Sequence, residues 1–346
     1  MLRAYGIPLR FVNIFQNLYI SSSCCVRTDN GYTDFFNIET GVKQGCSLSP
    51  ILFLLAVDYV MKRVMMSPVT GIPWTNGSHL TDLNFADDIA LLANTKPALQ
   101  SMTTCLEGEA EKVGLRINTD KTKVMCVNRQ TKVQITIGQQ TVEDIDEFTY
   151  LGSIVSNNEG GSEADVRCRI GKAAGVFQCL RRIWSSTTIN TGIKMRLYST
   201  IVIPTAIYAS ETWRNTKRIA QKLNVFHQWC LCQILGISYK DRITNEEVLQ
   251  RSGLQKLGEI VTERRMRLAG HLLRLPDKRI SKAAVHWTPT GGKRKQGRPK
   301  TTWRSTFIAD LKTTDIHSLD EARDAAADRT RWRALVAQCT KECGRN

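Results

Sequence analysis

The sequence of 346 residues has no apolar run long enough to cross a lipid bilayer. Residues 51–57 form a short apolar segment of the kind that lies in a buried core. Arg3 and Arg10 have no strongly apolar stretch beside them, so no secretory signal peptide is expected. These absences predict an intracellular protein with no membrane among its partners.

The sequence also lacks the cysteine pattern of a disulfide framework. Its eleven cysteines are an odd number at irregular spacings. A zinc site is one interpretation of two groups of residues: Cys230 and Cys232 near His227, and Cys339 with Cys343. Their spacings match no structural zinc pattern well. The segment around Cys230 has the pattern of a buried helix, in which cysteine acts as a small hydrophobic residue.

Acidic charge is scarce only in the C-terminal part of the chain. The formal net charge is +16. From Glu211 onward there are 28 Lys and Arg against 14 Asp and Glu, whereas residues 1–210 hold 20 against 18. Nucleic acid is the partner that such a basic excess predicts, because phosphate contacts release counterions. A membrane surface is the competing partner, and no apolar span supports it.

Two adjacent carboxylates, Asp87 and Asp88, stand between two apolar, strand-like segments within residues 83–92. This pattern predicts a β-hairpin with both carboxylates at its tip, because burying two unpaired carboxylates is costly. Neighbouring side chains of a strand point to opposite faces, so the two need not share one role. An isolated Asp-Asp pair indicates no more than a solvated turn. The neighbouring motifs therefore decide its interpretation.

Two further motifs flank the carboxylate pair. Residues 41–50 read Gly-Val-Lys-Gln-Gly-Cys-Ser-Leu-Ser-Pro, and residues 114–123 read Gly-Leu-Arg-Ile-Asn-Thr-Asp-Lys-Thr-Lys. With Phe-Ala-Asp-Asp at residues 85–88 between them, they resemble the B, C and D motifs of the reverse transcriptases of non-LTR (LINE-type) retrotransposons. The resemblance implies an RNA-directed DNA polymerase with an RNA template, a DNA primer or target, and deoxynucleoside triphosphates as partners.

The resemblance also implies roles for single residues in two-metal nucleotidyl transfer. Asp87 is implied as a ligand of Mg²⁺ or Mn²⁺, with Asp88 as the weaker ligand. Lys121 is implied to lie near the triphosphate, where an ammonium could stabilise or protonate the leaving pyrophosphate; it could equally be a solvated turn lysine. The residues implied to face the nucleotide, the template or the primer end are Gly41, Gln44, Gly45, Phe85 and Ala86.

One motif of this family is missing from the sequence. The A motif supplies a further metal-binding aspartate on a strand that should precede the helix beginning at Met1, and residues 2–8 match what normally follows that strand. Asp29 and Asp34 lie in the wrong sequence context to substitute for this aspartate. The fingers subdomain of the polymerase and any N-terminal endonuclease are missing too. We expect a C-terminal portion of a polymerase that cannot polymerise alone. The alternative is a non-catalytic nucleic-acid-binding protein derived from a retroelement.

The expected fold class is α+β. A truncated polymerase palm, with an antiparallel sheet and helices, is expected at residues 1–155, followed by a helical thumb and connection region at 156–288. A basic linker at 289–301 and a short helical C-terminal tail at 302–346 complete the expected order. Hydrophobic periodicity and turn signals predict the individual elements. The expected helices are 2–19, 50–66, 99–113, 164–184, 192–208, 216–235, 244–252, 254–275, 303–312 and 319–338; a hairpin is expected at 21–38, and strands at 123–127, 133–137 and 148–155.

The basic linker has three interpretations, of which we favour a solvated connector. Lys293, Arg294 and Lys295 could instead form a nuclear localisation signal, in keeping with a protein of the nucleus. A minor-groove arm is the third interpretation, because residues 297–299 resemble the core of an AT-hook, although Gln296 replaces the usual arginine. The linker residues expected to contact nucleic acid are Lys293, Arg294, Lys295, Arg298 and Lys300.

Overall fold

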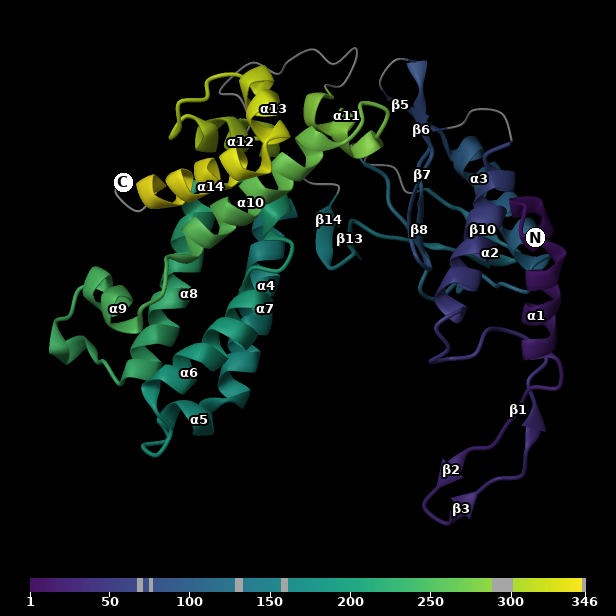
Figure 1. Cartoon of the computed structure of the whole chain (residues 1–346), viewed down its shortest axis with the longest axis horizontal. Helices are drawn as coiled ribbons and strands as arrows, with labels where there is room; N and C mark the ends of the chain where they lie inside the picture. Colours follow the sequence, from purple (N-terminus) through teal and green to yellow (C-terminus); the bar gives the residue numbers. More distant parts are fainter. Residues whose placement is uncertain (67–70, 75–76, 128–132, 157–160, 288–300, 344–346) are drawn as a thin grey trace. The chain divides into compact units, whose positions relative to one another are not determined.

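The computed structural model describes residues 1–66, 71–74, 77–127, 133–156, 161–287 and 301–343. Its chain divides into two compact units, Met1–Phe148 and Thr149–Asn346, which we call unit 1 and unit 2 (Figure 1). Across the described ranges, no helix is both long enough and apolar enough to cross a membrane.

Unit 1 is built on three helices. A 3-10 turn, η1 (Leu2–Tyr5), precedes α1 (Leu9–Tyr19), and Gly6 and Pro8 lie between them, so the helix expected at 2–19 is in two parts. The second helix, α2 (Ser49–Val64), has Pro50 in its first turn. The third, α3 (Lys96–Glu111), begins after Thr95, whose hydroxyl caps it by accepting a hydrogen bond from the Ala98 backbone N–H.

Helices α2 and α3 pack together around the main core of unit 1. Its buried residues are Val57, Val60, Met61, Val64, Leu106 and Ala110. Partly buried side chains that pack against them include Ile89 and Leu91 from a β-hairpin and Leu115 and Ile117 from the segment after α3. This core therefore joins the three sequence motifs to one scaffold.

Every sheet among the described residues has only two strands. The pairs are β1 (Ser23–Cys24) with β4 (Phe36–Asn37), β2 (Arg27–Thr28) with β3 (Gly31–Tyr32), β5 (Ile72–Pro73) with β6 (His79–Leu80), β7 (Asp82–Phe85) with β8 (Asp88–Leu91), β9 (Lys123–Val124) with β12 (Glu143–Asp144), β10 (Thr136–Ile137) with β11 (Gln140–Thr141), and β13 (Glu147–Tyr150) with β14 (Ser153–Ser156). The β9–β12 pair is parallel. The mixture of helices and small sheets agrees with the expected α+β class, whereas the continuous antiparallel sheet of a palm stays a prediction.

Unit 2 is helical apart from its first hairpin. Its helices are α4 (Gly161–Cys179), α5 (Arg181–Ser185), α6 (Thr191–Leu197), α7 (Ile203–Ala206), α8 (Lys217–Leu235), α9 (Asn245–Ser252), α10 (Leu257–Arg274), α11 (Ile280–His286), α12 (Trp303–Leu311), α13 (Leu319–Ala327) and α14 (Arg329–Cys343). A π-helical turn, η3 (Tyr198–Val202), joins α6 to α7, and short 3-10 turns occur at η4 (Ser210–Thr212) and η5 (Tyr239–Asp241).

Two buried cores stabilise unit 2. The first lies among α4, α6, α7, α8 and the start of α10, with Tyr198, Leu223 and Leu231 fully enclosed. The second lies between the end of α10 and the helices α12, α13 and α14 (Figure 1). Because α10 contributes to both cores, it is the central helix of unit 2.

Several predicted elements differ from the observed ones. The strand expected at 148–155 is a hairpin, because Leu151 and Gly152 both adopt positive φ angles and reverse the chain. The helix expected at 319–338 is interrupted at Asp328, and the helix expected at 164–184 is interrupted at Leu180. Helix α11 was not predicted. The remaining helices agree with the predicted ones within a few residues at their ends.

Candidate functional site

The β7–β8 hairpin places Asp87 and Asp88 at its tip. Phe85 pairs with Asp88 across the strands, and Ala86 and Asp87 form the two-residue turn between them. Both carboxylate residues are exposed to solvent. The predicted hairpin is therefore confirmed, while the roles of its residues stay predictions.

The two faces of this hairpin have different surroundings. Ile89 and Leu91 turn toward the core of α2 and α3. On the opposite face, Leu83 is 41% exposed and Phe85 is 63% exposed. Cross-strand partners share a face, so Asp88 lies on the outward face with Phe85. Asp87 lies in the turn itself, which agrees with the expectation that the two carboxylates have different positions.

Ala86 is the residue on which the turn depends. Its φ angle is 53°, in the left-handed region that alanine rarely occupies. The tight reversal at Ala86 is what puts Asp87 at the extreme end of the hairpin. A methyl group is the smallest side chain with a Cβ atom, so the tip carries little bulk beside the carboxylates.

A third carboxylate of the hairpin was not found by sequence reasoning. Asp82, at the start of β7, accepts hydrogen bonds from the Thr81 hydroxyl at 2.7 Å and from the Asn84 amide at 2.6 Å. Its cross-strand partner is Leu91, so it lies on the core-facing side. The only signal in the sequence was its two-residue spacing from Asn84, which places both on one face. These two bonds give Asp82 a structural role in fixing the strand.

The loop before α2 holds Gln44 and Gly45 in an exposed turn, with Gly45 at a φ of 81°. The turn is anchored by Lys43, whose ammonium donates to the Leu18 carbonyl at 2.9 Å and lies 5.6 Å from the centroid of the Tyr19 ring. No local pattern marks Lys43 in the sequence, because its partners are more than twenty residues away. Gly41, also exposed and at a φ of 92°, opens the loop.

The same loop is closed on its other side by Ser49, the first residue of α2. The Ser49 hydroxyl donates to the Lys43 carbonyl and is hydrogen-bonded to the Tyr19 hydroxyl at 3.3 Å. A hydrogen bond from the Leu48 backbone lowers the pKa of the Cys46 thiol. These contacts fix the backbone around Gln44 and Gly45 while leaving both residues accessible.

Lys121 lies in an exposed turn after α3. The turn is held by Asn118, whose side chain accepts the Lys121 backbone N–H at 3.0 Å and whose carbonyl accepts the Thr122 hydroxyl at 2.7 Å. The asparagine side chain here takes the place of a backbone acceptor, as in a local side-chain-to-backbone cap. The turn fixes the backbone of Lys121, and its catalytic role stays a prediction.

The carboxylate pair suits a hard divalent cation such as Mg²⁺, which is held by one or two carboxylates together with phosphates and water. Asp87 and Asp88 provide such oxygen donors in an exposed position. Within the described ranges, no three His, Cys, Asp or Glu side chains come together as a metal-binding group. Two carboxylates would leave the other coordination positions of such an ion to phosphate or water oxygens.

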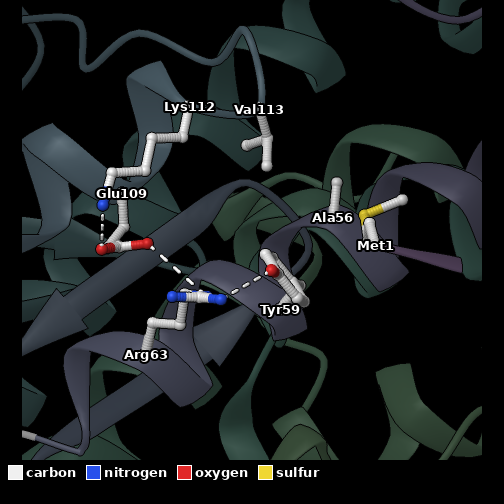
Figure 2. Close-up of a pocket in the computed structure, with 7 residues that line it drawn as sticks. All are labelled: Met1, Ala56, Tyr59, Arg63, Glu109, Lys112 and Val113. Carbon is white, nitrogen blue, oxygen red and sulfur yellow. Dashed lines mark hydrogen bonds and ion pairs between the residues drawn. The ribbon is translucent and has the colours of Figure 1, made fainter. Parts of the chain in front are cut away.

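A separate cavity of about 460 Å³ lies in unit 1 between α2 and α3 (Figure 2). Its residues are Met1, Ala56, Tyr59, Arg63, Glu109, Lys112 and Val113. Arg63 donates to the Tyr59 hydroxyl at 2.9 Å and lies 3.7 Å from the Glu109 carboxylate, which also pairs with Lys112 at 2.6 Å (Figure 2). Because these charges satisfy one another, the cluster stabilises the packing of α2 on α3 and includes none of the predicted site residues.

The distribution of charge follows the two units. Unit 1 has 13 Lys and Arg against 15 Asp and Glu, whereas unit 2 has 35 against 17. The excess of basic residues is therefore entirely in unit 2. The linker cations predicted to contact nucleic acid, Lys293, Arg294, Lys295, Arg298 and Lys300, lie outside the described residues.

Comparisons with known proteins add independent information. The family model "Reverse transcriptase (RNA-dependent DNA polymerase)" matches residues 2–155. A transposon-derived protein of Caenorhabditis elegans is 28% identical over 277 residues, which cover 77% of this chain and 98% of the worm protein. The retrovirus-related Pol polyprotein from the type-2 retrotransposable element R2DM of Drosophila melanogaster is 34% identical over 163 residues, which cover 44% of this chain and 15% of the polyprotein.

A second Pol polyprotein, from the retrotransposable element R2 of Nasonia vitripennis, is 28% identical over 171 residues, which cover 46% of this chain and 16% of the polyprotein. The chain thus spans nearly the whole worm protein but less than a fifth of either polyprotein. Polymerases of the matching family generally use divalent metal ions, with a nucleic-acid template and deoxynucleoside triphosphates as substrates. Residues 2–155 are thus similar to reverse transcriptase domains, and about half of the chain is similar to parts of two Pol polyproteins of retrotransposable elements.

Proposed function

We propose that this chain carries one part of the active centre of an RNA-directed DNA polymerase of a non-LTR retrotransposon. The observation that carries the proposal is the β7–β8 hairpin, which presents Asp87 and Asp88 at an exposed tip. In the sequence this acidic pair stands between the loop of residues 41–50 and the turn of residues 114–123, which resemble the family's B and D motifs. An exposed acidic pair is suited to nucleotidyl transfer by a two-metal mechanism.

In this mechanism Asp87, assisted by Asp88, would hold Mg²⁺ or Mn²⁺. The bound ion supplies activation of the primer 3′-oxygen and neutralises charge on the triphosphate. Gln44 and Gly45 offer an exposed, anchored backbone turn to the nucleotide and template. Lys121, with its backbone fixed by Asn118, would place an ammonium near the leaving pyrophosphate. Ala86 leaves room for the primer end beside the carboxylates.

We further propose that these residues need another polypeptide segment, one that brings an additional aspartate to the hairpin. Two exposed apolar surfaces in unit 1 support this. Leu83 and Phe85 cover the outward face of the hairpin, and Phe11, Ile14 and Leu18 form a stripe along α1 that is 39–50% exposed. Exposed apolar side chains that share one face of an element are suited to packing against a further segment. The chain alone is then inactive.

A primer-extension assay tests this proposal. The purified chain, an RNA template with an annealed DNA primer, deoxynucleoside triphosphates and Mg²⁺ should give no template-dependent extension. Extending the chain by the in-frame coding sequence upstream of Met1 should restore it, if that sequence encodes an aspartate-bearing strand. Template-dependent incorporation by the chain of 346 residues alone would contradict the proposed need for a further segment.

Asp87→Ala tests the proposed role of the hairpin in such an extended, active enzyme. Loss of a metal ligand should reduce the rate of nucleotide incorporation by at least about 100-fold, since each such electrostatic contact contributes several kcal/mol. Asp34→Ala is the matched control, because Asp34 is also an exposed aspartate of unit 1 outside the hairpin. Equal activities of the two variants would exclude Asp87 from catalysis.

One observation favours a second candidate function, a non-catalytic nucleic-acid-binding protein derived from a retroelement. The basic excess lies in unit 2, which contains none of the three polymerase motifs. Unit 2 would then bind nucleic acid whether or not unit 1 is active. A genome in which no aspartate-bearing strand is encoded in frame upstream of Met1 would favour this candidate over the polymerase.

The proposed location is the nucleus, on the strength of the basic linker sequence. A fluorescent fusion of the full chain should accumulate there, and replacement of Lys293, Arg294 and Lys295 by glutamine should make it diffuse. The same residues, with Arg298, can be tested as phosphate contacts. If the linker binds phosphates, replacing them flattens the dependence of DNA affinity on salt; an unchanged slope would leave only a connector.

A further inference from the structure

The place where α14 crosses α10 in unit 2 concentrates positive charge. Trp332 of α14 lies against Gly270 of α10, and its indole N–H donates to the Met266 carbonyl at 2.9 Å. Close by, the Arg274 guanidinium donates to the Ala326 carbonyl at 3.2 Å, just before α14 begins. The first turns of α14 are therefore fixed against residues 266–274 of α10 (Figure 1).

Five arginines lie on α10 and α14 along or beside the residues that make this crossing, and we call them the arginine patch. They are Arg267, Arg274, Arg329, Arg331 and Arg333. Arg274 is partly buried and the other four are exposed. The patch consists of arginines alone. It spans two helices that pack together through Trp332.

Acidic residues neutralise little of this charge. Glu263 pairs with Arg267. The Asp328 carboxylate caps α14, where it accepts the backbone N–H groups of Thr330 at 2.7 Å and Arg331 at 3.3 Å. Among the residues that the structure describes, no carboxylate lies within ion-pair distance of the remaining patch arginines: Arg274, Arg329, Arg331 and Arg333.

Two of the patch arginines, Arg274 and Arg329, are close enough to repel each other. Burial lowers the pKa of Arg274, and the positive charge of Arg329 lowers it further. Two guanidinium groups that repel each other are stabilised when an anion comes between them. Two exposed arginines elsewhere in unit 2 do have acidic partners: Arg218 pairs with Glu163 and Arg251 pairs with Glu247.

The chemistry of the patch favours phosphate groups. Arginine presents a planar fork of N–H donors that matches phosphate oxygens, and it is more weakly hydrated than lysine. Surfaces that hold single-stranded nucleic acid add exposed aromatic rings on which bases stack. The aromatic residue of this crossing, Trp332, is only 3% exposed and its N–H is already bonded. The patch therefore favours contact with the phosphate backbone of a double strand, whose bases are already stacked.

We propose that the arginine patch binds the phosphate backbone of double-stranded nucleic acid without reading its sequence. The inference rests on the proposed function, which brings a template–primer or target duplex to the protein, and it assigns a surface and residues to that contact. Binding of a duplex by the patch does not require the carboxylate pair, nor the further segment proposed to complete the active centre.

The test measures binding of the full chain to a fluorescent 20-base-pair duplex by anisotropy over a range of salt concentrations. Arg329→Gln with Arg333→Gln removes two cations spaced one helical turn apart. The variant should bind more weakly at every salt concentration. The slope of log affinity against log salt should fall by about 1.8, because each phosphate contact contributes about 0.9 to it. A DNA duplex and an RNA–DNA hybrid of the same sequence should respond alike.

The matched control is Arg218→Gln with Arg251→Gln, which changes the net charge equally but removes arginines that already have acidic partners. Its slope should stay within about half a unit of that of the unmodified protein. A rescue variant, Arg329→Lys with Arg333→Lys, should recover the slope because it restores the charge. Circular dichroism checks that all three variants are folded.

Equal losses in the patch variant and the control would overturn the proposal, because only net charge would then matter. An unchanged slope in the patch variant would overturn it as well. Neither result depends on polymerisation, so failure of the primer-extension experiment and failure of the patch experiment are separate outcomes.

Discussion

At the scale of single residues, Ala86 is the position where the local backbone and the proposed chemistry meet. Its φ of 53° costs a non-glycine residue about 1 kcal/mol. Ala86→Gly should therefore raise the free energy of unfolding of the hairpin by up to about 1 kcal/mol. Hydrogen exchange of the β7 and β8 amides measures this change. Ala90→Gly, in the regular part of β8, is the control and should speed exchange; faster exchange in Ala86→Gly would contradict the prediction.

His227 gives unit 2 a dependence on pH. It is 1% exposed, and its Nδ1 atom is hydrogen-bonded to the Tyr198 hydroxyl at 2.8 Å. Burial lowers the pKa of His227 from 6.5 to about 4. The unfolded chain binds a proton below pH 6.5, whereas the folded chain does so only near pH 4. The free energy of unfolding should therefore be highest above pH 6.5 and fall by about 3 kcal/mol as the pH drops to 4.

Urea titrations followed by tryptophan fluorescence at a series of pH values measure this effect. His227→Gln keeps a polar side chain but has no titrating group, so its stability should change less between pH 6.5 and 4. A variant that loses as much stability over this range as the unmodified protein would assign the dependence to other groups.

The sequence was informative about residues whose neighbours in the chain decide their position. Asp87 and Asp88 stand between two apolar segments, and this local pattern was enough to place them at a hairpin tip. The anchoring of Lys43 on the carbonyl of Leu18 depends on how the loop returns to α1. The bonds of Asp82 depend on a side-chain geometry that alternation alone does not specify. Such contacts become visible only after the chain has folded.

At the scale of elements, the approach of α14 to α10 requires a glycine. A Cβ atom at Gly270 would lie 2.1 Å from the Trp332 indole nitrogen, in a contact that a rigid ring cannot relieve. Gly270→Ala should lower the free energy of unfolding of unit 2 by about 1–3 kcal/mol or more. Gly258→Ala, on the same helix with nothing within 4 Å, should instead raise it by up to about 1 kcal/mol. Thermal melting compares the two; equal melting temperatures would contradict this account of the crossing.

Helix ends were predictable where capping residues or glycines mark them. Thr216 caps α8 by accepting the Ile219 backbone N–H, and Gly236, at a φ of 67°, ends it. The break between α13 and α14 had a weaker signal. Asp328 caps the start of α14, but it stands inside a continuous helical pattern with no glycine or proline beside it. Trp332, just after the break, packs on α10, and packing of this kind lies outside any local pattern.

At the scale of the whole molecule, charge and structure divide at the same place. Most of the basic excess lies from Glu211 onward, but residues 149–210 add seven Lys and Arg against only three Asp and Glu. Unit 2 therefore has a net charge of +18 and unit 1 a net charge of −2. Composition alone could not locate this division, because the boundary at Phe148 and Thr149 lies within strand β13 and has no linker signal.

The two units should also unfold separately. Each cluster of buried apolar side chains in the described part of the chain lies within one unit, so neither core requires the other. Unit 1 has two-stranded sheets and exposed apolar stripes, which provide little stability, whereas unit 2 has two enclosed helical cores. Unit 1 is therefore expected to unfold first on heating.

Tryptophan provides a reporter that separates the two events. Trp74 is the single tryptophan of unit 1, and the other six lie in unit 2. Far-ultraviolet circular dichroism reports helices of both units, whereas tryptophan fluorescence reports mainly unit 2. Part of the dichroism signal should therefore be lost roughly 5 °C or more below the fluorescence transition, since a difference of about 1 kcal/mol shifts the midpoint of a domain of this size by several degrees. Coincident transitions would mean that the units unfold cooperatively, and a shared interface would then have to stabilise unit 1.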